Sequence, residues 1–301
     1  MNILITGGTG LIGSALIPFL DNHHKVTVLS RNATKVYLNI GSHIHAIHKL
    51  SEIDFNQLDV VINLAGEAIV EKRWSKKQKQ KIEQSRWQLT QDIVDSMNNA
   101  NSPPHTFISG SAIGFYGRQN NQPIDESFDQ CNQEFSHTLC KEWESIALNA
   151  QSDTTRVCII RTGIVLSSHG GALCKMIPAY KFALGGPITD GSQMMSWIHI
   201  DDIIGMIMYL VEEQSLKGVF NATAPNPVSN AEFSSMLAES LNRPNFFRVP
   251  AKILTLLLGE MAELLIYGQN VRPNNITKAG YRFHYPELKE AFNHLLRHHS
   301  K

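Results

Sequence analysis

The first thirteen residues constrain the fold most, because they join a strand, a glycine-rich turn and a helix with no extra residue between them. The apolar run at 2–6 predicts a buried strand, and an amphipathic helix is expected from Leu11 to about Leu20. The turn between them carries four glycines, Gly7, Gly8, Gly10 and Gly13. Such a turn lets the backbone approach a pyrophosphate, which the N–H groups and positive dipole end of the helix then bind. No Gly-Lys-Ser/Thr follows, which excludes a P-loop.

The expected dinucleotide contacts come from three segments at the carboxyl ends of strands, where open α/β sheets bind their ligands. The full set is Gly7, Gly8, Thr9, Gly10, Leu11, Ile12, Gly13, Ser30, Arg31, Ala65 and Gly66. Arg31 decides the kind of nucleotide. An acidic residue after the second strand would bind the ribose 2′-hydroxyl of NAD, whereas an Arg suits the 2′-phosphate of NADP. The sequence therefore predicts NADP(H) as cofactor.

Strands and helices alternate along the first two thirds of the chain. Strands are expected at 25–29, 43–47, 58–64, 106–109, 156–161, 197–200 and 219–221, and helices at 74–99, 135–149 and 202–213. This order predicts an α/β fold, a Rossmann doubly wound parallel sheet. We expect a dinucleotide-binding domain at 1–222, in which the Gly-, Ser- and Pro-rich segment 163–196 supplies substrate-side loops. Residues 223–301 are expected to form a smaller, mostly helical C-terminal lobe.

Composition excludes several classes of protein. The 27 Lys and Arg balance the 27 Asp and Glu, so the net charge gives no indication of binding to nucleic acid or a membrane. We expect the basic run 72–81 to be the solvent-exposed start of a helix. The apolar stretch 253–266 is too short and too charged to span a bilayer, and we expect a helix packed on the domain. The expected first strand begins at residue 2, so we expect no signal peptide.

Cysteine and histidine spacing argues against a metal site. The four cysteines form no Cys-x-x-Cys pair, which disfavours zinc and a disulfide framework and favours reduced thiols in a cytoplasmic protein. His294 and His298 stand one helical turn apart, but no third ligand follows at a suitable spacing. We therefore expect no metal.

Longer motifs carry a family resemblance over nearly the whole chain. They lie at 6–13, 63–66 (Asn-Leu-Ala-Gly), 111–117 (Ser-Ala-Ile-Gly-Phe-Tyr-Gly), 161–166, 185–187, 197–202 (Trp-Ile-His-Ile-Asp-Asp), 220–228 and 258–262. Together they resemble an atypical extended short-chain dehydrogenase/reductase, in the YfcH-like group of the NAD-dependent epimerase/dehydratase-like family. The resemblance implies a Rossmann core, NADP(H) binding and a C-terminal helical segment. It does not supply a substrate.

The catalytic signature of that superfamily is only partly matched. Those enzymes carry a Tyr and, four residues later on the same helix face, a Lys that holds the nicotinamide ribose and lowers the pKa of the phenol. In the helix expected at 135–149, Lys141 fits the Lys and His137 then falls on the Tyr position. The resemblance thus implies a ribose contact for Lys141. His137 is either a proton carrier or a surface helix residue.

The assisting hydroxyl is also displaced. Ser111 lies one residue out of the usual register relative to Tyr116, and Ala112 takes the expected place. Tyr116 is the nearest phenol in sequence, and it is either the proton carrier or an aromatic floor for the pocket. The catalytic candidates are therefore Tyr116, Lys141, Ser111 and His137.

Two further segments have simpler interpretations. An Asp of 201–202 is expected to cap the helix that follows, and His199 to be a satisfied core or cap residue. Gly185, Gly186 and Pro187 are expected in a turn-rich flap over the substrate side.

The sequence supports two functions. The first is an NADP(H)-dependent oxidoreductase or epimerase-like enzyme that acts on a small molecule by hydride transfer. The alternative is a non-catalytic NADP(H)-binding sensor, which the missing Tyr favours. A homodimer is compatible with either, and fold alone does not choose between them.

Overall fold

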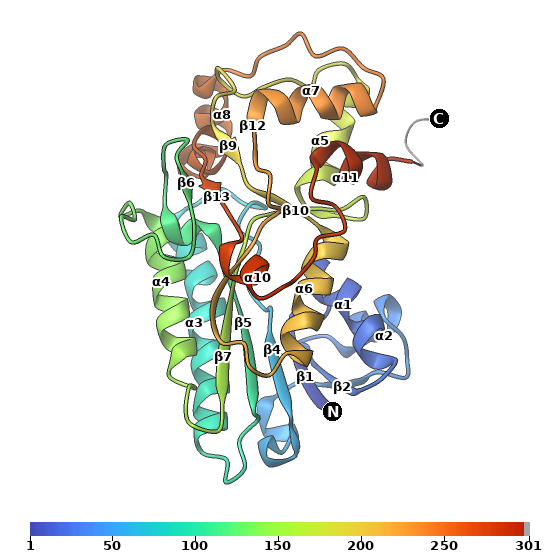
Figure 1. The fold of residues 1–301 in the computed structure, drawn as a ribbon, viewed down its shortest axis with the longest axis vertical. Coiled ribbons are helices and arrows are strands. Elements are labelled where there is room, and N and C mark those ends of the chain that lie inside the picture. The colour runs from blue at the N-terminus through green and yellow to red at the C-terminus, as the bar shows by residue number, and fades with distance from the viewer. Residues whose placement is uncertain (298–301) are drawn as a thin grey trace.

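A seven-stranded parallel sheet forms the centre of the molecule in a computed structural model that describes residues 1–297 (Figure 1). The strand order is β11-β7-β5-β4-β1-β2-β3. The strands are β1 (Asn2–Thr6), β2 (Lys25–Leu29), β3 (His45–Ile47), β4 (Val60–Asn63), β5 (Thr106–Ala112), β7 (Arg156–Thr162) and β11 (Gly218–Ala222). The chain moves outward from β1 in one direction and then from β4 in the other. This confirms the doubly wound Rossmann fold.

Helices cover both faces of the sheet. They are α1 (Leu11–Asp21), α2 (Ala33–Asn39), α3 (Lys76–Asn98), α4 (Phe135–Leu148) and α6 (Ile200–Glu212). Because side chains alternate along a strand, Ile3 and Ile5 of β1 pack on the face of α1 and α6, whereas Leu4 packs on the face of α3 and α4. Both faces are apolar, which is why these strands read as continuous apolar runs.

The smaller lobe lies beyond the carboxyl edge of the sheet (Figure 1). Its elements are β6 (Pro123–Ile124), β8 (Ile164–Leu166), α5 (Gly171–Lys181), β9 (Met194–Met195), β10 (Trp197–His199), β12 (Val228–Ser229), α7 (Asn230–Ser240), α8 (Ala251–Leu258), α9 (Glu263–Ile266), β13 (Asn270–Val271), α10 (Asn274–Lys278) and α11 (Leu288–Leu295). The segment 163–196 therefore contains a helix, α5, as well as loops. The expected flap at 185–187 is packed against the segment that contains Phe247, since Gly186 lies directly on the Phe247 backbone.

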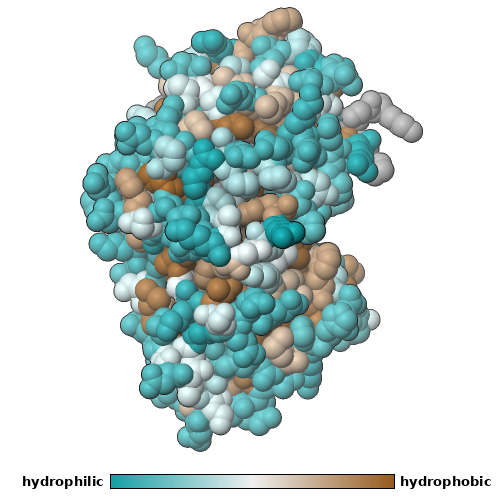
Figure 2. All heavy atoms as spheres, in the orientation of Figure 1, coloured by the Kyte–Doolittle hydropathy of each residue, from teal (hydrophilic) through white to brown (hydrophobic). Residues whose placement is uncertain are grey.

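The apolar stretch 253–266 differs from the expected packed helix. Helix α8 ends at Leu258 because Gly259 adopts a positive φ of 63°, and no residue of α8 is buried. Leu256 and Leu257 are 77% and 62% exposed. The expected single packed helix is therefore correct only for the second part of the stretch, where Met261 and Ala262 are buried, because periodicity cannot show whether an apolar face finds a partner. No helix among residues 1–297 is both long and apolar enough to cross a membrane. On the face drawn in Figure 2, hydrophobic residues are interspersed among hydrophilic ones.

The start of α6 also differs from expectation. His199 Nδ1 accepts the backbone N–H of Asp201 at 3.0 Å, so the cap of this helix is the histidine and not an aspartate. Asp202 is fully buried and accepts the N–H groups of His284 and Tyr285 at 2.6 and 3.0 Å. It ties the C-terminal segment to α6.

Candidate functional site

Of the four glycines in the turn at 7–13, three are closely packed and one, Gly10, is open. Gly7 has φ of 72°, and a Cβ there would lie 2.6 Å from the carbonyl carbon of Leu64. A Cβ on Gly13 would overlap the Gly7 carbonyl oxygen and lie 2.8 Å from the Gly8 Cα. A Cβ on Gly10 would meet only the Gly7 oxygen, at 3.2 Å, and Gly10 is exposed. The open position leaves the backbone free to approach a ligand.

The end of β4 lies directly beside this turn. The hydroxyl of Thr6 donates to Asn63 Oδ1 at 2.6 Å and accepts the backbone N–H of Ala65 at 3.2 Å. These two bonds hold Ala65 and Gly66 next to Gly7, as expected for segments that share one edge of the sheet.

On the other side of the turn, Leu11 opens α1 and contacts the substrate-side segment. A Cβ on Gly171 would lie 2.9 Å from Leu11 Cδ2. Of the remaining turn residues, Thr9 and Ile12 are half-buried, and Gly8 packs on Val28.

Ser30 and Arg31 lie at the same edge of the sheet. Strand β2 pairs with β1, and Leu29 stands opposite Thr6. Arg31 follows two residues later, is exposed, and has no ion pair or side-chain hydrogen bond within the described chain. A guanidinium without a partner at this edge of the sheet has the chemistry to bind a phosphate.

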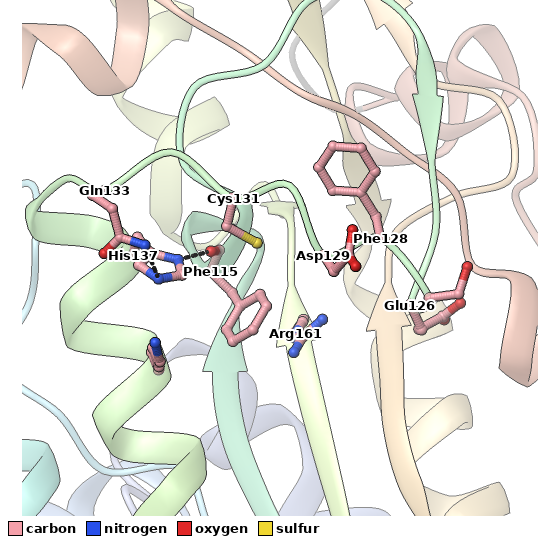
Figure 3. Close-up of a pocket in the computed structure, with 10 residues that line it drawn as sticks. Phe115, Glu126, Phe128, Asp129, Cys131, Gln133, His137 and Arg161 are labelled. Carbon is pink, nitrogen blue, oxygen red and sulfur yellow. Dashed lines mark hydrogen bonds between the residues drawn. The ribbon is translucent and has the colours of Figure 1, made fainter.

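A cavity of about 320 Å³ opens between the start of α4 and the segment 126–131 (Figure 3). Its walls are Phe115, Glu126, Ser127, Phe128, Asp129, Cys131, Gln133, His137, Lys141 and Arg161. Two of the four catalytic candidates, His137 and Lys141, therefore share one wall, and Ser111 and Tyr116 do not line this space.

His137 is 3% exposed, so it is not the surface helix residue that one interpretation expected, and it lines the wall of the cavity. Its Nδ1 is hydrogen-bonded to the carbonyl oxygen of Phe115, and its Nε2 lies 3.4 Å from the Gln133 amide nitrogen (Figure 3). A carbonyl only accepts, so Nδ1 carries the proton and Nε2 keeps its lone pair.

Tyr116 and Ser111 belong to a buried polar network instead. The phenol of Tyr116 donates to Asn221 Oδ1 at 2.9 Å and accepts from Arg161 Nη1 at 3.0 Å. Ser111 donates to Glu144 at 2.6 Å, and Glu144 also binds Arg161. Tyr116 is fully buried, and burial raises its pKa to about 12 despite the neighbouring guanidinium.

Helix α4 carries two pairs of residues spaced four apart, Ser136 with Cys140 and His137 with Lys141. The orientation of the helix turns the two pairs toward different surroundings. Ser136 and Cys140 face the turn after β5, because a Cβ on Gly114 would lie 3.1 Å from Ser136 Cβ and 3.7 Å from Cys140 Sγ. Consecutive helical residues differ by about 100° in direction. Lys141 accordingly points away from Cys140, is exposed, and lines the cavity beside Arg161. The sequence could not show which pair faces the end of the sheet.

Comparison with known proteins places this geometry in a family. A family model described as "NAD dependent epimerase/dehydratase family" matches residues 3–222. The chain belongs to this family. A second model, a domain of unknown function named DUF1731, matches residues 249–295 of this epimerase-family protein.

Relatives and solved structures agree with that assignment. The epimerase family protein YfhF of Bacillus subtilis is 35% identical over 98% of both chains, and the chloroplastic SDR39U1 homolog of Arabidopsis thaliana is 36% identical over 98% of this chain and 87% of its own length. The crystal structure of human SDR39U1, solved with NADPH, superposes with a TM-score of 0.91 at 31% identity over 99% of both chains. A Bacillus cereus UDP-glucuronic acid 4-epimerase shares the fold at 19% identity, with a TM-score of 0.78 and 99% and 98% coverage.

Three potential metal ligands do meet in space, although the sequence showed no third ligand. His199, Asp201 and His294 bring one ligand atom each within 4.8 Å of one another, and His298 lies outside the described residues. His199 Nδ1 already accepts an N–H, so Nε2 carries the proton and donates to His294 Nδ1 at 3.1 Å. This arrangement leaves His199 no lone pair for a metal.

The sequence missed the partners of Arg161 and the place of Arg86. Arg161 was visible only as part of a family motif, because its partner Glu144 lies on a different element. Arg86 sat inside a polar helix with no pattern to distinguish it. Only its contacts with Gly66 and Trp143 single it out.

Proposed function

We propose that this protein is an NADP(H)-dependent oxidoreductase or epimerase-like enzyme that acts on a small molecule. The observation that carries the proposal is the open face at Gly10, with Arg31 unpaired at the same edge. The NADPH in the crystal structure of human SDR39U1, a relative along almost the full length, supports the same cofactor.

The residues of the glycine turn fit the pyrophosphate, and Arg31 fits the 2′-phosphate. Ala65 and Gly66 border the path between them and the end of β5. When bound, the nicotinamide would supply hydride transfer. The protein supplies orientation, exclusion of water and a proton.

His137 is the proton carrier that the contacts favour. It lines the cavity, and its Nε2 has only a long contact of 3.4 Å with the Gln133 amide, whereas the phenol of Tyr116 is enclosed between Asn221 and Arg161. Tyr116 then has a structural role in the buried network with Asn221 and Arg161. Lys141, on the same wall, provides a positive charge toward the cavity.

One observation supports the non-catalytic alternative. The α4 residues that face the end of β5 are Ser136 and Cys140, which offer neither a phenol nor a cation there. A protein of this kind would bind NADP(H) and signal its occupancy to a partner. Four free thiols suit a reducing compartment such as the cytoplasm under either function.

Turnover separates the two functions. Mass spectrometry of small molecules that co-purify with the protein selects candidates, and a panel of carbonyl and sugar-nucleotide compounds is then tested for oxidation of bound NADPH. With an active compound, His137→Asn should lower kcat about 10²–10⁴-fold while Tyr116→Phe stays close to wild type. Tight NADPH binding with no active compound would favour the sensor.

A further inference from the structure

The outer end of the smaller lobe is built from two segments that run side by side, 181–189 and 243–249. The N–H of Val249 donates to the carbonyl oxygen of Pro187 at 2.9 Å. Helix α8 follows the second segment directly, because it begins at Ala251. The loop from α7 to α8 lies at the upper end of the longest axis of the molecule (Figure 1). These segments therefore form one continuous tip, at the end of the molecule.

Large apolar side chains gather on this tip without being covered. In α8, Leu256 and Leu257 follow Ile253 by three and four residues, which places the three side chains on one face of the helix, and no residue of α8 is buried. Seven side chains, which we call the tip surface, are between 50% and 85% exposed: Phe182, Leu184, Phe246, Phe247, Ile253, Leu256 and Leu257. Single apolar side chains are normal on a protein surface, but a contiguous group of them marks an interaction site.

The charged residues of the segments that carry the tip surface are all basic. No Asp or Glu occurs in 170–189 or in 240–259, whereas these two ranges hold five basic residues, Lys175, Lys181, Arg243, Arg248 and Lys252. Arg248 and Lys252 are exposed, and their side chains form no hydrogen bond or ion pair within residues 1–297. Both cations are therefore available to a partner.

The acidic groups that flank these ranges are already engaged. Glu239 and Glu260 are each held in an ion pair, with Lys289 and Lys79 respectively. Asp190 accepts hydrogen bonds within its own turn. The net charge of zero for the whole chain thus conceals a surface that is locally both basic and apolar.

Charge decides which kind of partner the tip surface fits. A second copy of the chain would bring one basic surface against another, and like charges facing each other are unfavourable. The surface of an anionic bilayer is complementary in both respects, because its phosphates attract Lys and Arg and its acyl boundary accepts apolar side chains.

We propose that the tip surface docks on membranes that contain anionic phospholipids. Phe246, Phe247 and the apolar face of α8 enter the boundary between headgroups and acyl chains, and Arg248 and Lys252 contact the phosphates. With eight residues, α8 is about 12 Å long against roughly 30 Å of hydrocarbon, so it lies in the interface and does not span it. This inference is independent of the proposed function.

Co-sedimentation of the full chain with lipid vesicles tests the docking. The wild-type protein should bind vesicles of phosphatidylcholine and phosphatidylglycerol mixed two to one, and should bind vesicles of phosphatidylcholine alone about tenfold or more weakly. Added salt should weaken binding to the mixed vesicles, because exposed charges are screened.

Variants separate the two parts of the surface. The double variant Arg248→Gln/Lys252→Gln should bind the mixed vesicles roughly twenty- to thirtyfold more weakly, the effect of two basic residues near an anionic surface. Phe246→Ser should weaken the same binding roughly ten- to a hundredfold, because its ring no longer leaves water. The matched controls are Lys35→Gln and Leu38→Ser on α2, both exposed and outside the tip surface, and neither should change binding.

Several results would overturn the inference. They are no binding of the wild-type protein to the mixed vesicles at low salt, equal binding to both kinds of vesicle, and unchanged binding in the folded variants. Circular dichroism checks folding, and Leu256→Ser on α8 replaces Phe246→Ser if that variant does not fold. Sedimentation velocity tests the other partner: a wild-type dimer that Phe246→Ser dissociates would assign the tip surface to a second copy of the chain instead.

Discussion

Arg161 and Glu144 form a bidentate ion pair between β7 and α4, with Nε–Oε1 at 2.8 Å and Nη2–Oε2 at 2.7 Å. Both side chains are almost fully buried, at 5% and 6% exposure. The pair fixes the rotation of α4 on the sheet, because Glu144 must reach both Arg161 of β7 and Ser111 of β5. That rotation in turn decides which α4 residues face the end of β5.

Removing the carboxylate should therefore be costly. Glu144→Gln leaves the buried guanidinium unpaired, and we expect the free energy of unfolding to fall by about 3–5 kcal/mol. Urea denaturation measures it. The matched control is Glu239→Gln in the exposed pair with Lys289, which should change stability by less than about 1 kcal/mol. A Glu144→Gln protein as stable as the control would show that the pair does not hold α4.

Tyr116→Phe tests the phenol in the same network. The variant keeps the ring but leaves Asn221 Oδ1 and Arg161 Nη1 without this partner, so stability should fall by about 1–3 kcal/mol. NADPH affinity should not change. Thermal unfolding and a nucleotide titration check the two parts, and a normal stability with impaired turnover would restore Tyr116 as the proton carrier.

Substitutions at two glycines of the turn should have different effects, one on NADPH binding and the other on folding. In Gly10→Val the added side chain fills open space, so the protein should fold but lose NADPH binding. In Gly13→Val the side chain meets the backbone of Gly7 and Gly8, so the fold itself should be lost or strongly destabilised. Circular dichroism and calorimetry distinguish the cases. Retained NADPH binding in folded Gly10→Val would contradict the site.

Arg31 should set the choice of nucleotide. Its unpaired guanidinium gives NADPH an advantage over NADH of roughly ten- to a hundredfold, which corresponds to about 1.5–3 kcal/mol. Arg31→Ala should remove most of that preference without affecting NADH. Titration of both nucleotides on both proteins is the measurement, and equal wild-type affinities would reject the assignment.

His199 should make stability depend on pH. Burial, with the nearby His294 and His284, lowers its pKa to about 3, below the value of about 6.5 in an unfolded chain. The folded state thus binds fewer protons, so the contribution is complete above pH 6.5 and is lost as the pH falls from 6.5 toward 3, by up to about 1.4 kcal/mol per unit. His199→Asn keeps a cap acceptor without titrating. Its unfolding free energy should decline less steeply between pH 6.5 and 4.5, and parallel slopes would count against this origin.

The sequence by itself determined the elements whose signal is local. Strand β1, the turn at 7–13 and helix α1 were predicted with their boundaries, because apolar runs and glycines act on the backbone where they stand. The alternation of strands and helices was enough for the doubly wound sheet. The glycine turn with Arg31, and then the family motifs, indicated NADP(H) as the cofactor.

Only the tertiary structure decided which side chains meet. On α4, one position in register turns a side chain by about 100°, which puts Cys140 toward β5 and Lys141 toward the cavity. Spacing alone fits either pair. The rotation is set by the contact of Glu144 with Arg161 on another strand, and the place of Arg86 by the contact of two helices. These are long-range contacts, and no local pattern in the chain encodes them.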